Sequence, residues 1–192
     1  MAWQWLLSIK LVIKLNFPFI ERKLELPKGV SAEIDGKIVR MTGLKGSLTR
    51  DFGHTPVEVT KEGDTVLVIT ARNLKRSELS IVGTVQAHLR NMAKGVTTGH
   101  VYRLKMAYAH FPMNVKVVND TTMIENFIGE RAPRRAHVQG GVEVRVDGDD
   151  IVVSGVDKEN VSQTAANIQR ATRIRAYDRR VFSDGIFVYQ KE

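Results

Sequence analysis

Two stretches of the chain repeat the same alternation of apolar and polar residues. Residues 57–69 (VEVTKEGDTVLVI) and 142–154 (VEVRVDGDDIVVS) each alternate, reach a glycine beside acidic residues, and continue as an apolar run. Alternation with a period of two around an acidic-glycine turn is typical of a β-hairpin. Both copies therefore predict strand, turn and strand, and they begin 85 positions apart.

Each repeated hairpin is followed by apolar residues at helical spacing. After the first copy the apolar stripe consists of Val82, Val85, Leu89, Met92 and Val96. We expect Gly95 to end this helix as a C-terminal cap. After the second copy, Asp157 can cap a helix whose inner face carries Val161, Ala165, Ile168 and Thr172. Both stripes predict burial in a core.

The rest of the chain reads as short strands separated by turns. We expect strands over 24–30, 101–109, 115–118, 123–127 and 186–189, and a hairpin over 31–41 that turns at Asp35-Gly36. A two-fold repeat of this length indicates a duplicated domain, because a solenoid needs three or more units. The predicted fold class is α+β, with two duplicated domains, each a mostly antiparallel sheet with one helix on one face. Their predicted bounds are 24–98 and 99–192.

Residues 1–23 are predicted to form an N-terminal extension. The first twenty are apolar, as in a signal peptide or membrane anchor, but Lys10 and Lys14 interrupt them and no small-residue cleavage site follows. The longest uncharged stretch is nine residues, which is short of the roughly 18–20 needed to cross a bilayer. The alternatives are an extension that is disordered alone or ordered against a partner, and a start codon assigned too far upstream.

The charge of the chain favours a polyanionic partner. It carries 29 Lys and Arg against 21 Asp and Glu, a formal net charge of +8. Nucleic acid is the commonest partner of such a basic protein, and the alternative is a basic protein whose charges are only solvated. The chain has no cysteine, which excludes disulfides and cysteine-ligated zinc and fits an intracellular, cytoplasmic protein.

The sequence offers no pattern of catalytic chemistry. The five histidines are widely spaced, and none lies with acidic residues at metal-ligand spacing. Phosphate-binding glycine loops and the G-x-S-x-G nucleophile motif are missing from the sequence. We therefore expect no enzyme activity, no cofactor and no metal site.

Three basic clusters are the candidate binding residues. The first is residues 129–135 (GERAPRR), where arginines around a proline can present guanidinium forks to phosphates. The second runs off the second helix and comprises Arg170, Arg173, Arg175, Arg179 and Arg180. The third is Arg90 and Lys94 ahead of 95–99 (GVTTG), where small residues allow backbone to approach a sugar-phosphate chain. For each cluster the alternative is a solvated face, or cations opposing a helix dipole; together they favour nucleic acid.

Five blocks of sequence resemble a known family. They are residues 91–97 (NMAKGVT), 109–112 (AHFP), 124–130 (IENFIGE), 163–168 (QTAANI) and 180–186 (RVFSDGI). In this order and spacing they resemble the universal large-subunit ribosomal protein family that is numbered six in bacteria and nine in eukaryotes. The closing block is similar to the archaeal and eukaryotic branch. Phe187 departs from the tyrosine usual in that branch, and the first twenty residues match nothing known in the family.

The resemblance implies a function as well as a fold. It implies two similar α+β domains, no enzyme activity, and binding of large-subunit rRNA, mainly by the second domain, near the sarcin–ricin loop and the stalk base. Neighbouring ribosomal proteins would be met there, with translation factors close by. The RNA-facing positions that it implies, together with the basic clusters, are Arg90, Lys94, Gly95, Thr97, Thr98, Gly129, Arg131, Arg134, Arg135, Arg173, Arg175, Arg179, Arg180 and Asp184.

Two other classes of function fit the same residues. One is a free-standing RNA- or DNA-binding regulator that uses the same basic faces. The other is a scaffold held at a membrane surface by the apolar, lysine-bearing N-terminus. Co-sedimentation with the large ribosomal subunit separates the first of these from a ribosomal protein, and deletion of residues 1–20 tests the second.

Overall fold

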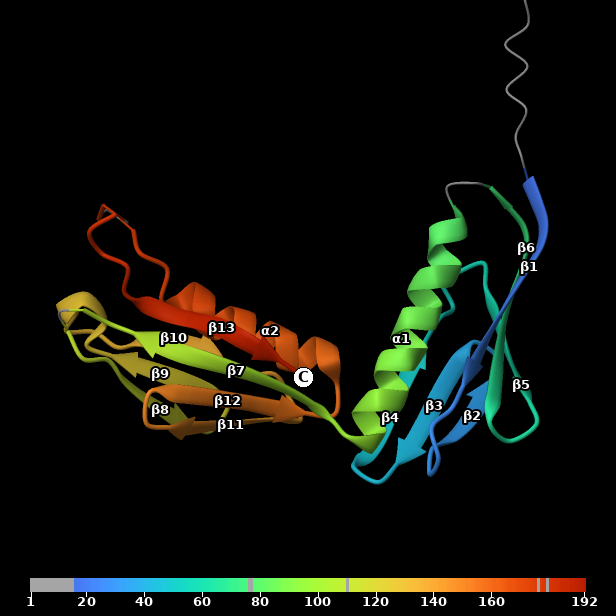
Figure 1. Cartoon of the computed structure of the whole chain (residues 1–192), viewed down its shortest axis with the longest axis horizontal. Coiled ribbons are helices and arrows are strands. Elements are labelled where there is room, and N and C mark those ends of the chain that lie inside the picture. The colour runs from blue at the N-terminus through green and yellow to red at the C-terminus, as the bar shows by residue number, and fades with distance from the viewer. Residues whose placement is uncertain (1–15, 76–77, 110, 176, 179) are drawn as a thin grey trace, which may run out of the picture.

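The computed structural model describes residues 16–75, 78–109, 111–175, 177–178 and 180–192. Figure 1 shows two lobes, the first built from the N-terminal half and the second from the C-terminal half. Residues 1–15 of the predicted N-terminal extension lie outside the described residues. In the described part of the chain, no helix is both long and apolar enough to span a membrane.

The first lobe consists of two three-stranded antiparallel sheets and one helix. One sheet has the order β1-β6-β5 and the other the order β2-β3-β4. The bounds are β1 Asn16–Glu25, β2 Ser31–Asp35, β3 Ile38–Gly43, β4 Gly46–Asp51, β5 Glu58–Glu62, β6 Val66–Lys75 and α1 Leu79–Thr97. The predicted stripe of α1 is buried against both sheets, with Val82, Val85 and Leu89 each at most 1% exposed.

The second lobe repeats this plan and adds a strand. Its sheets have the orders β11-β12-β7-β13 and β10-β9-β8. The bounds are β7 His100–Ala107, β8 Asn114–Val118, β9 Thr121–Glu125, η2 Phe127–Gly129, β10 Arg134–His137, β11 Val142–Asp147, β12 Asp150–Gly155, α2 Lys158–Ala171 and β13 Gly185–Lys191. The inner face of α2 is buried as predicted, since Val161, Ala165 and Ile168 are at most 1% exposed.

The duplication is visible in the order and pairing of the elements. The two repeated phrases form the hairpins β5-β6 and β11-β12, and each hairpin leads into a helix. In both lobes the second strand of that hairpin pairs antiparallel with the first strand of its lobe, β1 or β7. Among the described residues of the first lobe β13 has no counterpart, and it pairs with the other edge of β7. The fold is therefore α+β with a pseudo-repeat, as predicted.

Gly95 does not end α1, which corrects the sequence-based expectation. It lies buried inside the helix, whose cap is Thr98, and Gly99 follows with a left-handed φ of +78°. A Cβ at Gly95 would collide with the backbone carbonyl oxygen of Val156. Gly95 is thus needed for close approach of the second lobe to α1, while Gly99 supplies the backbone conformation that ends helices.

The first sheet also begins earlier than expected. β1 starts at Asn16 and pairs with β6 along its length. From the sequence, residues 16–23 are expected in the extension and a strand is expected to start at Leu24. Glu21, Arg22 and Lys23 are three consecutive charged residues that interrupt the alternation of apolar and polar residues, so the sequence carries only a weak strand signal there.

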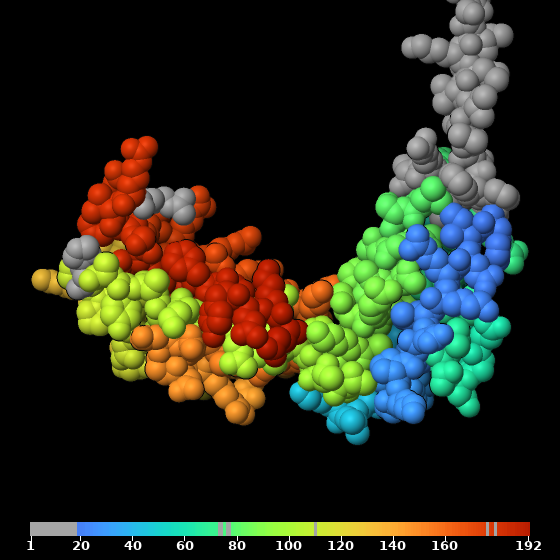
Figure 2. Space-filling model, viewed as in Figure 1, coloured from blue at the N-terminus to red at the C-terminus, as the bar shows by residue number. Residues whose placement is uncertain are grey.

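The two lobes meet at a junction where polar side chains of β4 and α1 contact the first turn of α2. Glu159, in the first turn of α2, accepts one hydrogen bond from Nη1 of Arg50 at 2.7 Å, and its Oε1 lies 3.3 Å from Nδ1 of His88. Partial burial, with the nearby Arg50 cation, lowers the pKa of His88 below its ordinary value. Lys158 donates to the side chain of Asn91 at 3.3 Å. Figure 2 shows that the lobes spread apart away from this junction and leave an open angle between them.

Candidate nucleic-acid interface

Two of the three predicted clusters meet at one end of the second lobe. The segment 129–135 runs from the end of η2 into β10, and the segment 173–184 lies between α2 and β13. Figure 1 shows both segments at the end of this lobe that is remote from the first lobe. A hydrogen bond from Arg134 to the carbonyl oxygen of Arg173, at 3.0 Å, ties them together.

Each nitrogen of the Arg134 guanidinium donates to a protein group. It forms a fork with Glu130, with donor–acceptor distances of 2.8 and 2.6 Å. Its Nη1 also donates to the carbonyl oxygen of Ala171 at 2.8 Å, and its Cζ lies 4.2 Å from the centre of the Phe127 ring. The hydrogen bond from Arg134 lowers the pKa of Glu130 below its ordinary value.

This geometry gives Arg134 a bracing role. Its side chain is only 23% exposed, and it satisfies carbonyl oxygens at the end of α2 that no intrahelical donor reaches. Arg134 and Arg135 are expected in a loop from the sequence, but both lie in β10. RNA contact by Arg134 stays a prediction, and one that these internal contacts do not favour.

The other arginines of this end are exposed. Arg131, Arg135, Arg173, Arg175 and Arg180 all lie open to solvent, and we call these five residues the arginine cluster. Arg179, also predicted from the sequence, lies outside the described residues. Each exposed guanidinium group can bind a phosphate oxygen, so this end of the lobe is suited to a polyanionic chain. RNA contact by each residue stays a prediction.

Gly129 shapes the loop rather than only leaving room for RNA. Three residues of this turn have left-handed backbone conformations, with φ values of 58° at Asn126, 51° at Ile128 and 74° at Gly129. A Cβ at Gly129 would lie 3.3 Å from a carbon of the Phe111 ring. Glycine therefore fits this position for both its φ and its lack of a side chain.

Asp184 is buried, in contrast to the other predicted positions of this end. It is 2% exposed, and its Oδ1 accepts a hydrogen bond from the backbone N–H of Ala109 at 3.0 Å. Its Oδ2 has no hydrogen-bond partner among the described residues. The carboxylate thus fastens the tail to the end of β7 and keeps one acceptor unsatisfied.

The third predicted cluster lies on the other lobe. Arg90, Lys94 and Thr98 are exposed, whereas Gly95 is buried and Thr97 half-buried. The hydroxyls of Thr97 and Thr98 donate to the carbonyl oxygen of Lys94, at 2.9 and 3.1 Å. Both threonines therefore help to close the end of α1, and the lobes keep this cluster apart from the arginine cluster (Figure 1).

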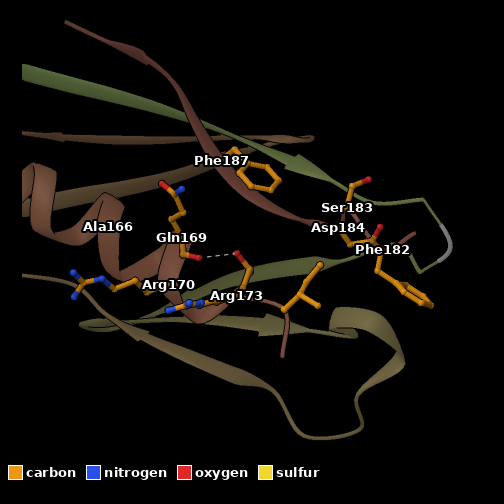
Figure 3. A pocket seen from close by; sticks show the side chains of 10 residues that line it. Ala166, Gln169, Arg170, Arg173, Phe182, Ser183, Asp184 and Phe187 are labelled. Carbon is orange, nitrogen blue, oxygen red and sulfur yellow. Dashed lines mark hydrogen bonds between the residues drawn. The ribbon is translucent and has the colours of Figure 1, made fainter. Parts of the chain in front are cut away.

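Sequence reasoning missed a recess beside the arginine cluster. It has a volume of about 500 Å³ and is formed where the end of α2 meets the segment before β13. Figure 3 shows Gln169, Arg170 and Arg173 on the side of α2. Phe182 and Ser183 come from the segment before β13, and Phe187 comes from β13 itself. The two segments are adjacent only in the folded chain, so a linear motif could not have revealed the recess. Among the described residues, no group of three His, Cys, Asp or Glu side chains could hold a metal ion.

Comparison with known proteins gives a family model and relatives that agree on one family. A family model described as ribosomal protein L6 matches residues 26–99 and 111–185. Large ribosomal subunit protein uL6 of Methanothrix thermoacetophila is 44% identical over 172 residues, which are 90% of this chain and 97% of the relative. The protein of that name from Ignicoccus hospitalis is 44% identical over 91% of this chain and 96% of its own length. The one from Aeropyrum pernix is 43% identical over 90% and 95%.

Proposed function

The chain belongs to the ribosomal protein L6 family, and from this premise we propose that its second lobe anchors it to large-subunit ribosomal RNA through the arginine cluster. Proteins of this family are structural components of the large ribosomal subunit and not enzymes. This chain is therefore a ribosomal protein of the archaeal type, at work in the ribosome of the cytoplasm. It binds rRNA in support of translation.

The observation that carries the proposal is the gathering of exposed arginines at one end of the second lobe. Arg131 and Arg135 come from one segment, and Arg173, Arg175 and Arg180 from another, and Arg134 holds the two segments together. The affinity of a protein for RNA depends on how many phosphates its cations neutralise. Cations gathered from two segments on a braced backbone need less ordering on binding than cations on a loose loop.

We propose that the rRNA bound in this way lies near the sarcin–ricin loop and the base of the stalk. The resemblance to the family supports this position. Neighbouring ribosomal proteins at the stalk base, and translation factors that dock nearby, are the further partners that we propose. The first lobe, which carries a separate cluster at Arg90 and Lys94, lies beyond an open angle and is available for such neighbours.

Sedimentation and footprinting together test this function. The full chain is mixed with large subunits that lack it, centrifuged through a sucrose gradient at high salt, and the bound rRNA is probed chemically. We expect the protein to co-sediment and to protect nucleotides at the sarcin–ricin loop or stalk base. Protection elsewhere on the rRNA would refute the position. Tight binding to short nucleic acids without co-sedimentation would indicate a free-standing RNA-binding regulator instead.

A further inference from the structure

The recess at the end of α2 has the size of a small-molecule site. Its volume of about 500 Å³ lies within the roughly 300–1,000 Å³ of pockets that enclose a ligand. It is bordered by Ala166, Gln169 and Arg170 on the helix and by residues of the tail. The hydroxyl of Thr172 in its wall donates to Gln169 and accepts from the backbone N–H of Ile186, so this wall is fixed by hydrogen bonds.

An aromatic ring forms one side of the recess. Phe187 lines it and is 46% exposed, although phenylalanine is a residue that folding usually covers. A Cβ at Gly185 would lie 2.9 Å from Cζ of Phe187, so the ring lies close over the glycine backbone. The absence of a side chain at Gly185 thus leaves room for the ring in this position. An exposed aromatic ring of this kind is a stacking platform for a nucleic-acid base.

Positive charge lies on the opposite side. Arg170 and Arg173 line the recess and are exposed, and Figure 3 shows them across the opening from Phe187. The backbone that carries them is held by Arg134, which donates to the carbonyl oxygens of Ala171 and Arg173. Two guanidinium groups on a braced backbone fit a phosphate group that enters beside a stacked base.

A buried carboxylate forms part of the wall of the recess. Asp184 lines the recess and is 2% exposed, and its Oδ1 accepts a hydrogen bond from the backbone N–H of Ala109 at 3.0 Å, so this part of the wall is fixed as well. Its Oδ2 has no hydrogen-bond partner among the described residues, but this atom is buried and is not open to a ligand in the recess. The features that favour a nucleotide are therefore the exposed aromatic ring and the two guanidinium groups. A small inorganic anion would use only the guanidinium groups.

We infer that this recess receives one unstacked nucleotide of the rRNA, with its base on Phe187 and its phosphate between Arg170 and Arg173. This inference rests on the proposed function and adds a specific contact to it. The arginine cluster binds the backbone of the RNA without regard to sequence. The recess would select a position where a nucleotide is flipped out of its stack, because only an unpaired base can enter it.

Substitution of Phe187 in the full chain tests the contact. Phe187→Leu keeps an apolar side chain but removes the stacking surface, and Phe187→Tyr keeps the ring. Tyr189→Leu is the matched control, because Tyr189 is 53% exposed on the same strand and does not line the recess. Affinity for transcribed large-subunit rRNA is measured at one salt concentration for all variants. We expect Phe187→Leu to bind about 5- to 100-fold more weakly, and the other two to bind as the wild type does.

A second variant and a cross-link complete the test. Ala166→Leu narrows the recess from the helix side without changing any charge, and we expect it to weaken binding as well. Ultraviolet cross-linking of the wild type, followed by mass spectrometry, should attach one nucleotide to the peptide that contains Phe187. Thermal unfolding of each variant is measured first, so that a loss of affinity is not mistaken for a loss of fold.

The outcomes separate this inference from the proposed function. If the wild type binds the rRNA and Phe187→Leu and Ala166→Leu bind equally well, the inference is wrong and the proposed function stands. A cross-link from this peptide to another ribosomal protein, in assembled subunits, would likewise overturn it. If the wild type does not bind large-subunit rRNA at all, the proposed function itself fails.

Discussion

Replacement of Arg134 by alanine should destabilise the second lobe. The residue lies in the basic segment 129–135, which the sequence predicts to bind RNA. The change removes a fork to Glu130, two hydrogen bonds to carbonyl oxygens at the end of α2, and a contact with the Phe127 ring. Arg135 is the matched control, since it is the next residue in β10 and is exposed.

The expected magnitude follows from these contacts. A hydrogen bond to a charged group contributes about 1.5–3 kcal/mol, and an exposed ion pair about 0.2–1 kcal/mol. The cation over the ring contributes roughly 0.5–2 kcal/mol. Because such contributions are not additive and water can replace part of the donors, we expect a net loss of about 2–4 kcal/mol for Arg134→Ala. The change for Arg135→Ala should stay within about 0.5 kcal/mol.

Thermal and urea unfolding of the full chain measure the difference. If the chain unfolds as one unit, a loss of this size lowers Tm by roughly 5–15 °C. Arg134→Lys provides an intermediate case, because an ammonium group cannot form the planar fork. Equal Tm values for Arg134→Ala and Arg135→Ala would refute the bracing role. A flattened salt dependence of rRNA binding in Arg134→Ala, with an unchanged Tm, would show that this guanidinium serves the RNA instead.

Three further predictions concern single groups of the fold. Gly95→Ala should lower the free energy of unfolding by about 1–3 kcal/mol, because a Cβ there meets the carbonyl oxygen of Val156. Gly83 lies in the same helix with open space around it, so Gly83→Ala should raise the free energy of unfolding by about 0.4–1 kcal/mol. Urea unfolding of both variants measures the two changes. The lowered pKa of Glu130 means that its ionised form is favoured in the folded chain, so its contribution is complete above the ordinary value of 4.5 and is lost as pH falls through the folded value. The stability difference between wild type and a variant that lacks the Arg134 side chain should therefore narrow on acidification, and a constant difference in pH-dependent unfolding would contradict this. Asp157 caps α2 by accepting from the backbone N–H two residues later, and Asp157→Ala should lower stability by about 1 kcal/mol in the same unfolding assay; an unchanged midpoint would speak against the cap.

The local part of the fold could be predicted from the sequence. The hairpin turns at Gly63 and Gly148 were predicted because both glycines stand beside acids within alternating strands, and both have a positive φ. The buried stripes of α1 and α2 follow from spacing alone, since three- and four-residue steps share a helix face. These features depend on residues that are close in sequence.

Contacts between distant segments could not be predicted in this way. Arg134 finds its acceptors at Ala171 and Arg173, 37 and 39 positions away, and no local pattern distinguishes it from the exposed Arg135. Asp184 was predicted to face RNA, but its burial depends on β7 and the end of α2. Gly95 resembles a helix cap in sequence, and only the position of the second lobe reveals its close contact with Val156.

The salt dependence of rRNA binding tests the central claim most directly. Two double variants, each losing two positive charges, are compared in the full chain: Arg131→Gln with Arg135→Gln in the second lobe, and Arg90→Gln with Lys94→Gln in the first. If the arginine cluster neutralises phosphates, the second-lobe variant should flatten the slope of log affinity against log salt by roughly 1.4–1.8, from about 0.7–0.9 per phosphate. The first-lobe variant should flatten it by less than about half of that. A second-lobe variant with an unchanged slope, or a larger effect from the first lobe, would contradict the account.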